Sequence, residues 1–139
     1  MTASVITVQA LVNTPVEKVW ELWTNTDHIT KWNSASPEWH LPEATHNLEA
    51  GGKFLYRMEA KDKSMGFDFT GTFTEVIKNE VIKYTIDDNR KVTVNFSREG
   101  NATRIVESFE DESENPLDMQ RTGWQAIMDN FKKYAEAQI

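Results

Sequence analysis

Glu107 is the acidic residue whose position is hardest to reconcile with an ordinary surface site. Strict alternation places it with Ile105 and Phe109, on the strand face that should be apolar. A carboxylate buried there would be paired, protonated or reserved for a polar group of a ligand. A bulge or a slip of one residue would instead turn Val106 inward and expose Glu107. Because shifted carboxylates also occur in structural networks, a structural role is weighed above that of a functional acid.

The three histidines are the other side chains that could take part in acid–base chemistry or bind a metal. His28, His40 and His46 do not share the spacing that places metal ligands on one face of a helix, so we predict no metal site. His40 follows Trp39 in a stretch without a regular pattern. It could line the mouth of a cavity there, although an exposed loop histidine is the more common outcome.

The chain carries none of the short motifs that identify the common catalytic or phosphate-binding sites. We find no nucleophile elbow, no phosphate-binding loop and no HExxH zinc motif. The chain has no cysteine, which excludes disulfides, thiolate zinc sites and cysteine nucleophiles. The sequence therefore assigns no catalytic residue, no metal and no cofactor.

Charge and composition exclude further classes of function. The 139 residues suit a single domain over residues 1–139, and the formal net charge of −7 argues against nucleic acid or an anionic membrane as partner. No apolar run approaches the ~20 residues of a membrane span. The first residues lack the basic region of a signal peptide, so we expect a cytoplasmic protein. Aromatic residues make up 11% of the chain, enough for an aromatic core or a surface that awaits a ligand.

The elements that must position these side chains begin with a strand and two short helices. Alternation predicts a half-buried strand over residues 6–12. An apolar stripe over residues 16–23 predicts a helix, and a second short helix follows over residues 27–32. The pattern over residues 34–50 is irregular and contains two prolines. It predicts a loop, with a short strand near residues 46–48.

The rest of the chain reads as a meander of strands followed by one long helix. Alternating segments joined by short turns indicate antiparallel strands. Pro116 opens the C-terminal helix, whose apolar stripe includes Trp124 and Phe131. This arrangement is typical of an α+β fold with the helices on one face of the sheet. The expected strands cover residues 54–59, 65–77, 80–86, 92–96 and 103–109.

A glycine interrupts the aromatic face of one of these strands. In the stretch MGFDFTGTF, Phe67, Phe69 and Phe73 share a face, and Gly71 takes the place between the last two. Glycine inside a strand usually marks a bulge, a bend or the close approach of another group. Space beside Gly71 is therefore expected to serve the approach of a helix or a ligand, with simple packing as the alternative.

Several segments in this order resemble a known family. They are TPVEKVWELWTNTDHITKW, GGKFLYRM, GTFTEV, IKYTI and TGWQAIMDNFKKY. Together they are similar to the family named after the C-terminal domain of the activator of Hsp90 ATPase, within the START-like (SRPBCC) superfamily. The resemblance implies a helix-grip fold, in which a curved antiparallel sheet of six or seven strands wraps around the long C-terminal helix. It also implies an elongated hydrophobic cavity between the sheet and that helix.

Residues on the facing surfaces are the candidates to line such a cavity. Gly123 in the helix would face Gly71, and the hydroxyls of Tyr56 and Tyr84 could orient the polar end of a ligand. Any one of these side chains is more often core than ligand contact. The candidate ligand-binding residues are Trp32, Trp39, His40, Tyr56, Met58, Phe69, Gly71, Phe73, Tyr84, Phe96, Glu107, Gly123, Trp124 and Met128.

Three functions are compatible with this resemblance. The first is a non-enzymatic module that binds a small apolar or amphipathic molecule, lipid-like or aromatic, in the cavity. The second is a co-chaperone-like domain that interacts with an Hsp90-type ATPase, as the family name suggests. The third is a cyclase or hydrolase working within the cavity, with Glu107, His40 and the tyrosines as the available acid–base groups. The first is the leading hypothesis, and the third is disfavoured because no acid–base pair is recognisable in the sequence.

Overall fold

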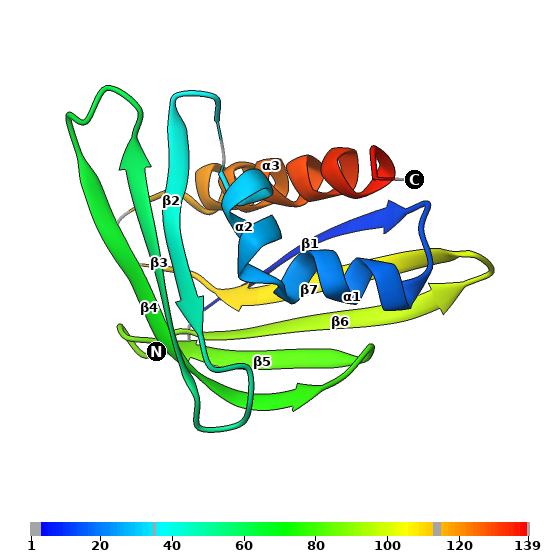
Figure 1. Cartoon of the computed structure of the whole chain (residues 1–139). Helices are drawn as coiled ribbons and strands as arrows, with labels where there is room; N and C mark the ends of the chain where they lie inside the picture. Colours follow the sequence, from blue (N-terminus) through cyan, green and yellow to red (C-terminus); the bar gives the residue numbers. More distant parts are fainter. Residues whose placement is uncertain (1–3, 35, 113–114, 139) are drawn as a thin grey trace.

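The part of the chain that the structure describes forms a curved sheet and three helices, in the order β1, α1, α2, β2 to β7 and α3 (Figure 1). The structure is a computed structural model that describes residues 4–34, 36–112 and 115–138. The helices are α1 (Val16–Thr24), α2 (Thr26–Trp32) and α3 (Leu117–Glu136). The strands are β1 (Val5–Val12), β2 (Trp39–His46), β3 (Lys53–Ala60), β4 (Gly66–Ile77), β5 (Val81–Ile86), β6 (Lys91–Glu99) and β7 (Ala102–Glu110).

All seven strands belong to one antiparallel sheet with the order β1-β7-β6-β5-β4-β3-β2. The meander from β2 to β7 therefore pairs each strand with the next, and β1 closes on β7 at the far edge. This confirms the α+β fold. The number of strands in the sheet, seven, agrees with the six or seven expected. Short turns make this topology possible because antiparallel neighbours need only a hairpin connection.

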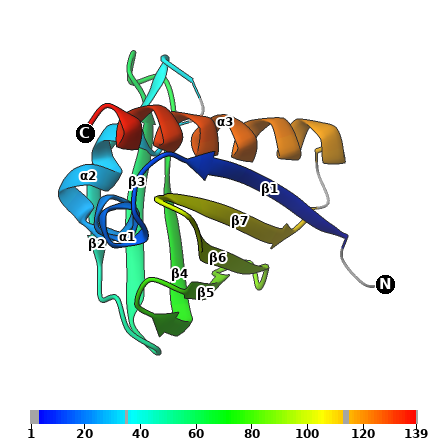
Figure 2. The same cartoon turned by 90° about the vertical axis from the view of Figure 1, so that its right-hand side faces the viewer.

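The sheet bends strongly, so that its concave face surrounds the helices. In Figure 2, β1, β7, β6 and β5 form a layer below α3, while β2, β3 and β4 stand nearly upright at one side. A register shift in β4 between Phe73 and Glu75 lies where the two parts meet. Bulges bend a strand and increase its twist. The bulge in β4 is therefore a local cause of the curvature that opens space over the concave face.

The core fills the angle between α3 and the strands it covers. Side chains of β1 alternate strictly between buried and exposed, with Ile6, Val8 and Val12 inside. The predicted apolar stripe of the long helix is present, and Phe131 and Ala135 are fully buried. α3 packs most closely on β1, whereas α2 packs on β2 at the opposite edge. The helices thus cover the two ends of the concave face and leave its middle to side chains.

The prediction of a loop over residues 34–50 is wrong for residues 39–46. Trp39–His46 forms the edge strand β2, which pairs with β3 and has a bulge between His40 and Glu43. Pro42 lies in this bulge, where its missing N–H costs no ladder hydrogen bond. The strand escaped prediction because the bulge and the proline break the alternation that identifies a strand.

The space beside Gly71 is filled by a side chain from the neighbouring strand, not kept open. Gly71 pairs directly with Phe54 of β3. A Cβ atom at Gly71 would lie 2.6 Å from Cζ of Phe54 and 2.5 Å from the carbonyl oxygen of Thr85. An aromatic ring laid over a strand glycine is a known way of stabilising a sheet. The packing alternative is therefore the correct explanation of this glycine.

Gly71→Ala is expected to lower the free energy of unfolding by about 1–3 kcal/mol, because the new methyl group overpacks the contact with Phe54. Urea unfolding measures the change. Gly123→Ala is the matched control, since no atom lies within 4 Å of a Cβ there. Removing a glycine from a helix interior should stabilise the protein by up to ~1 kcal/mol. Equal stability of Gly71→Ala and the wild type would contradict the packing explanation.

Candidate ligand-binding site

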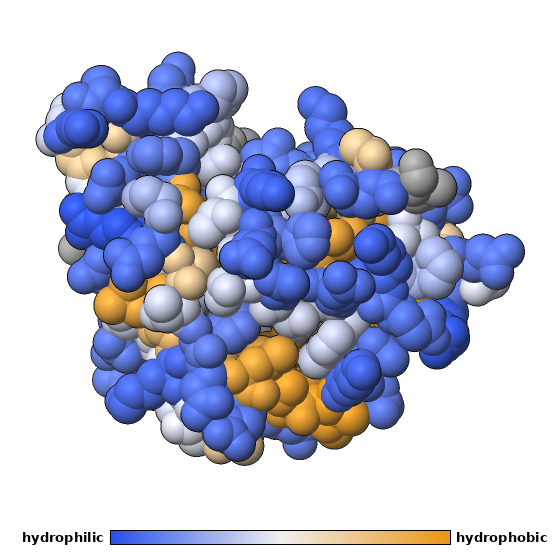
Figure 3. Space-filling view, in the orientation of Figure 1, coloured by the Kyte–Doolittle hydropathy of each residue, from blue (hydrophilic) through white to orange (hydrophobic). Residues whose placement is uncertain are grey.

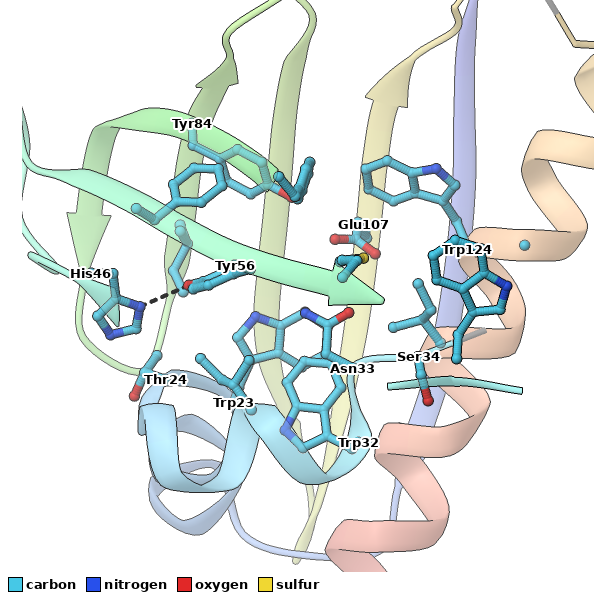
Figure 4. A pocket seen from close by; sticks show the side chains of 18 of the residues that line it. Trp23, Thr24, Trp32, Asn33, Ser34, His46, Tyr56, Tyr84, Glu107 and Trp124 are labelled. Atoms are coloured by element: carbon cyan, nitrogen blue, oxygen red, sulfur yellow. Dashed lines mark hydrogen bonds between the residues drawn. The ribbon is translucent and has the colours of Figure 1, made fainter. Parts of the chain in front are cut away.

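A cavity of about 420 Å³ lies between the middle of the concave face and the helices (Figure 4). Side chains from α1, α2, α3 and β2 to β5 contribute to its wall, together with Glu107 of β7. Most of the predicted ligand-binding residues meet around this one space. Those that line it are Trp32, Trp39, His40, Tyr56, Met58, Phe69, Phe73, Tyr84, Glu107, Gly123 and Trp124.

Three predicted residues do not line the cavity. Gly71 lies under the ring of Phe54. Phe96 points toward α1, where its ring centroid is 5.3 Å from that of Trp20 in an edge-to-face contact. Met128 is 1% exposed and belongs to the hydrophobic core beneath α3. Shared strand or helix periodicity placed these residues on the correct face, but only the bend of the sheet decides which part of that face is open.

The cavity also includes residues that the sequence reasoning missed. Phe67 shares its strand face with Phe69 and Phe73, and Trp23 lies in the apolar stripe of α1, so both carried a signal. Four more lie on the apolar faces of regular elements and carried the same signal: Ile29, Phe54, Ile82 and Ile127. The rest come from the end of α1, from β2, from the loop after α2 or from turns, where no periodicity marks them. The missed residues are Trp23, Thr24, Ile29, Asn33, Ser34, His46, Leu48, Phe54, Phe67, Ile82, Arg90 and Ile127.

One wall of the cavity is held by a cluster of three aromatic rings. The centroid of Trp23 is 4.8 Å from that of Trp32, and each indole lies 4.8 Å from the ring of Phe131. The indole N–H of Trp32 donates to the carbonyl oxygen of Leu22 at 3.0 Å. This bond satisfies the polar atom of a buried tryptophan. The cluster joins α1, α2 and α3, so it fixes the helices relative to the cavity.

Glu107 points into the cavity, as strict alternation along β7 requires. Its neighbours in the sheet are Val8 of β1 and Val94 of β6, each 1% exposed. Glu107 itself is 7% exposed, and no side chain among the described residues donates a hydrogen bond to its carboxyl group. In Figure 4 the carboxyl group lies between Tyr84 and Trp124. The slipped register, which would have exposed Glu107, is therefore not the one adopted.

Burial raises the pKa of the Glu107 carboxyl from its ordinary value of 4.5 to about 8. The physical cause is desolvation, because the charged form loses water and gains no cation in exchange. Glu107 is therefore mostly protonated and neutral at pH 7. A neutral carboxyl group can donate one hydrogen bond and accept others.

Two tyrosines and a histidine supply further polar atoms. The hydroxyl of Tyr56 and Nδ1 of His46 lie 2.7 Å apart and share a hydrogen bond (Figure 4). Burial lowers the pKa of His46, which keeps the imidazole neutral at pH 7. Burial, and secondarily the nearby Glu107, raises the pKa of Tyr84 well above its ordinary value of 10. All three groups are thus uncharged hydrogen-bonding groups at neutral pH.

Aromatic and charged side chains meet where the cavity approaches the surface. Trp39 and Phe67 lie with ring centroids 6.0 Å apart, and Phe67 is 50% exposed. Arg90 reaches the wall from the turn between β5 and β6, and its Nε donates to the Asp88 carboxylate at 2.8 Å. The single cationic side chain in the described wall is therefore already paired. The surrounding surface is mainly hydrophilic on the face shown in Figure 3, with a few hydrophobic patches.

The described residues also bear on metal binding and membrane insertion. Within residues 4–34, 36–112 and 115–138, no three His, Asp or Glu side chains gather closely enough to hold a metal ion. Over the same part of the chain, no helix combines the length and apolar character needed to cross a bilayer.

The curved antiparallel sheet, the long C-terminal helix and the cavity between them define a helix-grip domain of the START-like class. The sequence pattern of the family described as activator of Hsp90 ATPase homolog 1-like protein matches residues 13–136. The chain belongs to this AHSA1-like family. No curated protein matches the chain.

Solved structures agree with this assignment. The solution structure of the AHSA1-like protein from Aeromonas hydrophila is 41% identical, with a TM-score of 0.91 over 97% of this chain and 94% of that one. A protein from Cytophaga hutchinsonii is 50% identical, with a TM-score of 0.83 over 96% of this chain and 92% of its own. A protein from Nitrosomonas europaea is 16% identical with a TM-score of 0.82, covering 96% and 95% of the two chains, and shares the fold alone.

Proposed function

We propose that the protein is a non-enzymatic module that binds one small apolar or amphipathic molecule between the sheet and α3, in the cytoplasm. The observation that carries the proposal is the cavity of about 420 Å³ with its largely aromatic wall. Small-molecule sites are commonly apolar cavities of ~300–1,000 Å³ with a few placed polar groups. Glu107, Tyr56 and Tyr84 supply such groups here.

Apolar burial would provide most of the affinity. Each 100 Å² of apolar ligand surface removed from water contributes about 2.5 kcal/mol before the entropic costs of binding are subtracted. The wall is held in place by the contacts of Trp23, Trp32 and Phe131, so little protein ordering is needed when a ligand enters. A preformed site of this kind loses less free energy to ordering than a flexible one.

The arrangement of polar groups supports binding more than catalysis. A general base acts on a nucleophile or a substrate proton within hydrogen-bond reach, and it is usually oriented by a third group. His46 is bonded to Tyr56, a phenol whose pKa burial raises further. Glu107 receives no orienting hydrogen bond from the described side chains. A cyclase or hydrolase function would require the substrate itself to complete such a pair.

A binding assay with a cavity-filling variant tests the proposal. Ile127 lines the cavity from α3, and Ile127→Trp would place an indole in it. The wild type should bind the neutral dye Nile red, and the variant should bind it at least ~10-fold more weakly, a loss of ~1.4 kcal/mol. Lys133→Trp adds the same indole on the exposed side of α3 and should leave binding unchanged. Fluorescence titration measures the three dissociation constants.

Native mass spectrometry of the protein purified from cells extends this test to natural ligands. A small molecule that accompanies the wild type but not Ile127→Trp would support the proposal. Failure of the wild type to bind Nile red, or equal binding by Ile127→Trp, would refute it. The family description suggests an interaction with an Hsp90-type chaperone instead. In that case the wild type and both variants would form a complex with the chaperone and change its ATPase rate.

A further inference from the structure

We propose that the cavity prefers a ligand whose polar end is a protonated amine, held by the carboxyl group of Glu107 at the inner wall. This inference rests on the proposed function and names the chemical class of its ligand. Its basis is the position of one acidic side chain that nothing in the described chain neutralises.

Glu107 is an unusual group to find in the wall of an apolar cavity. It is 7% exposed, it points into the cavity, and its two neighbours in the sheet are valines. A buried carboxyl group normally has a cation or several hydrogen-bond donors as partners. Since the described side chains supply neither, a partner that enters the cavity from solution can supply both.

The other groups that face this space do not compete for that role. Tyr84 of β5, Tyr56 of β3 and His46 of β2 are uncharged at neutral pH, because burial opposes ionisation of each. Arg90 lies at the edge of the wall and is paired with Asp88. The remaining elements around Glu107 present apolar side chains: Val8 of β1, Val94 of β6, Trp124 and Ile127 of α3, and, from α2, Ile29 and Trp32. His40 stands at the outer end of β2, with Nε2 4.0 Å from the Glu59 carboxylate.

An ammonium group suits this set of atoms better than a carboxylate or a hydroxyl. It attracts the carboxylate of Glu107 and brings several N–H donors. When the Tyr56 hydroxyl donates to Nδ1 of His46, its lone pairs remain able to accept from such donors. A ligand carboxylate would be repelled once Glu107 ionises, and an alcohol would gain one neutral hydrogen bond. The formal net charge of −7 also favours the approach of a cation.

Binding of an amine would be coupled to the release of a proton. Free Glu107 is mostly protonated at pH 7. An ammonium ligand favours the carboxylate, so the proton of Glu107 leaves for the solvent and the cavity gains no net charge. Between pH 6 and 8 the affinity for an amine should therefore rise with pH, by up to ~10-fold per unit. The affinity for an alcohol should stay constant over the same range.

Three probes with the same alkyl chain test the inference: octylammonium, 1-octanol and octanoate. Displacement of Nile red at pH 6 and pH 8 measures their affinities for the wild type, Glu107→Gln and Glu43→Gln. At pH 8 the wild type should bind octylammonium at least ~10-fold more tightly than 1-octanol, and octanoate most weakly. Glu107→Gln should lose the preference for the amine over the alcohol. Glu43→Gln removes an exposed carboxyl group of β2 and should keep the preference for the amine.

The outcomes separate this inference from the proposed function. If the wild type binds 1-octanol as tightly as octylammonium, or if Glu107→Gln keeps the preference, the inference is wrong while the binding function stands. If none of the probes displaces Nile red and the dye itself does not bind, both are wrong. If Glu43→Gln loses the amine preference as fully as Glu107→Gln does, the preference arises from the acidic surface. That result would also overturn the inference.

Discussion

At pH 9, the Glu107→Gln variant is expected to unfold at a clearly higher urea concentration than the wild type. In the folded protein the pKa of Glu107 is raised from 4.5 to about 8, because the ionised carboxyl group is buried. Between these two pH values the folded state keeps a proton that the unfolded state has released. The contribution of the protonated Glu107 to stability is therefore fully present below pH 4.5 and is lost as the pH rises through 8.

The expected size of this effect is large for a single side chain. At ~1.4 kcal/mol for each pH unit between the two pKa values, the wild type should lose roughly 4 to 5 kcal/mol from pH 4.5 to 9 relative to the variant. Urea unfolding at several pH values measures the difference. Glu43→Gln is the control and should follow the wild-type curve. Parallel curves for the wild type and Glu107→Gln would show that Glu107 is not buried in its neutral form.

Phe131→Ala is expected to lower the free energy of unfolding by ~3–5 kcal/mol, the usual cost of truncating a fully buried phenylalanine. Phe131 is 0% exposed and makes edge-to-face contacts with Trp23 and Trp32. Its removal leaves a void where three helices meet and loosens the cavity wall. Thermal and urea unfolding measure the loss, and the change in tryptophan fluorescence reports the change in packing.

Phe67→Ala makes the same change of side chain at the cavity mouth. Phe67 is 50% exposed and touches Trp39, so its truncation should change stability by less than ~1 kcal/mol. A loss as large as that of Phe131→Ala would mean that the mouth stabilises the fold as much as the helix junction does. A small loss at both positions would show that the aromatic cluster is loosely packed.

The two effects of Glu107 oppose each other. Its carboxyl group costs stability at neutral and alkaline pH, yet it is the group that would select the ligand. A residue that destabilises the free protein and gains a partner on binding is common at functional sites, where stability and activity compete. A bound amine would restore part of the lost stability, because a ligand that binds only the folded state stabilises it.

Several features of the fold could be predicted from local patterns alone. Alternation identified β1 and β7, and the helical stripe identified the buried face of α3, because periods of 2.0 and 3.6 residues are visible in the sequence itself. The ordered segments also indicated the family. The inward position of Glu107 followed from the same alternation, although a slip of one residue remained an alternative at that level.

The tertiary structure decided the features that depend on partners far apart in the chain. The pairing of β7 with β1 and β6 places Val8 and Val94 beside Glu107, and the pairing of β3 with β4 lays Phe54 over Gly71. The bulge of β2 and the bend of the sheet determine which aromatic residues face open space. Local sequence determines which residues share a face, because backbone geometry is local. Which faces meet, and whether they leave room, depends on packing over the whole chain.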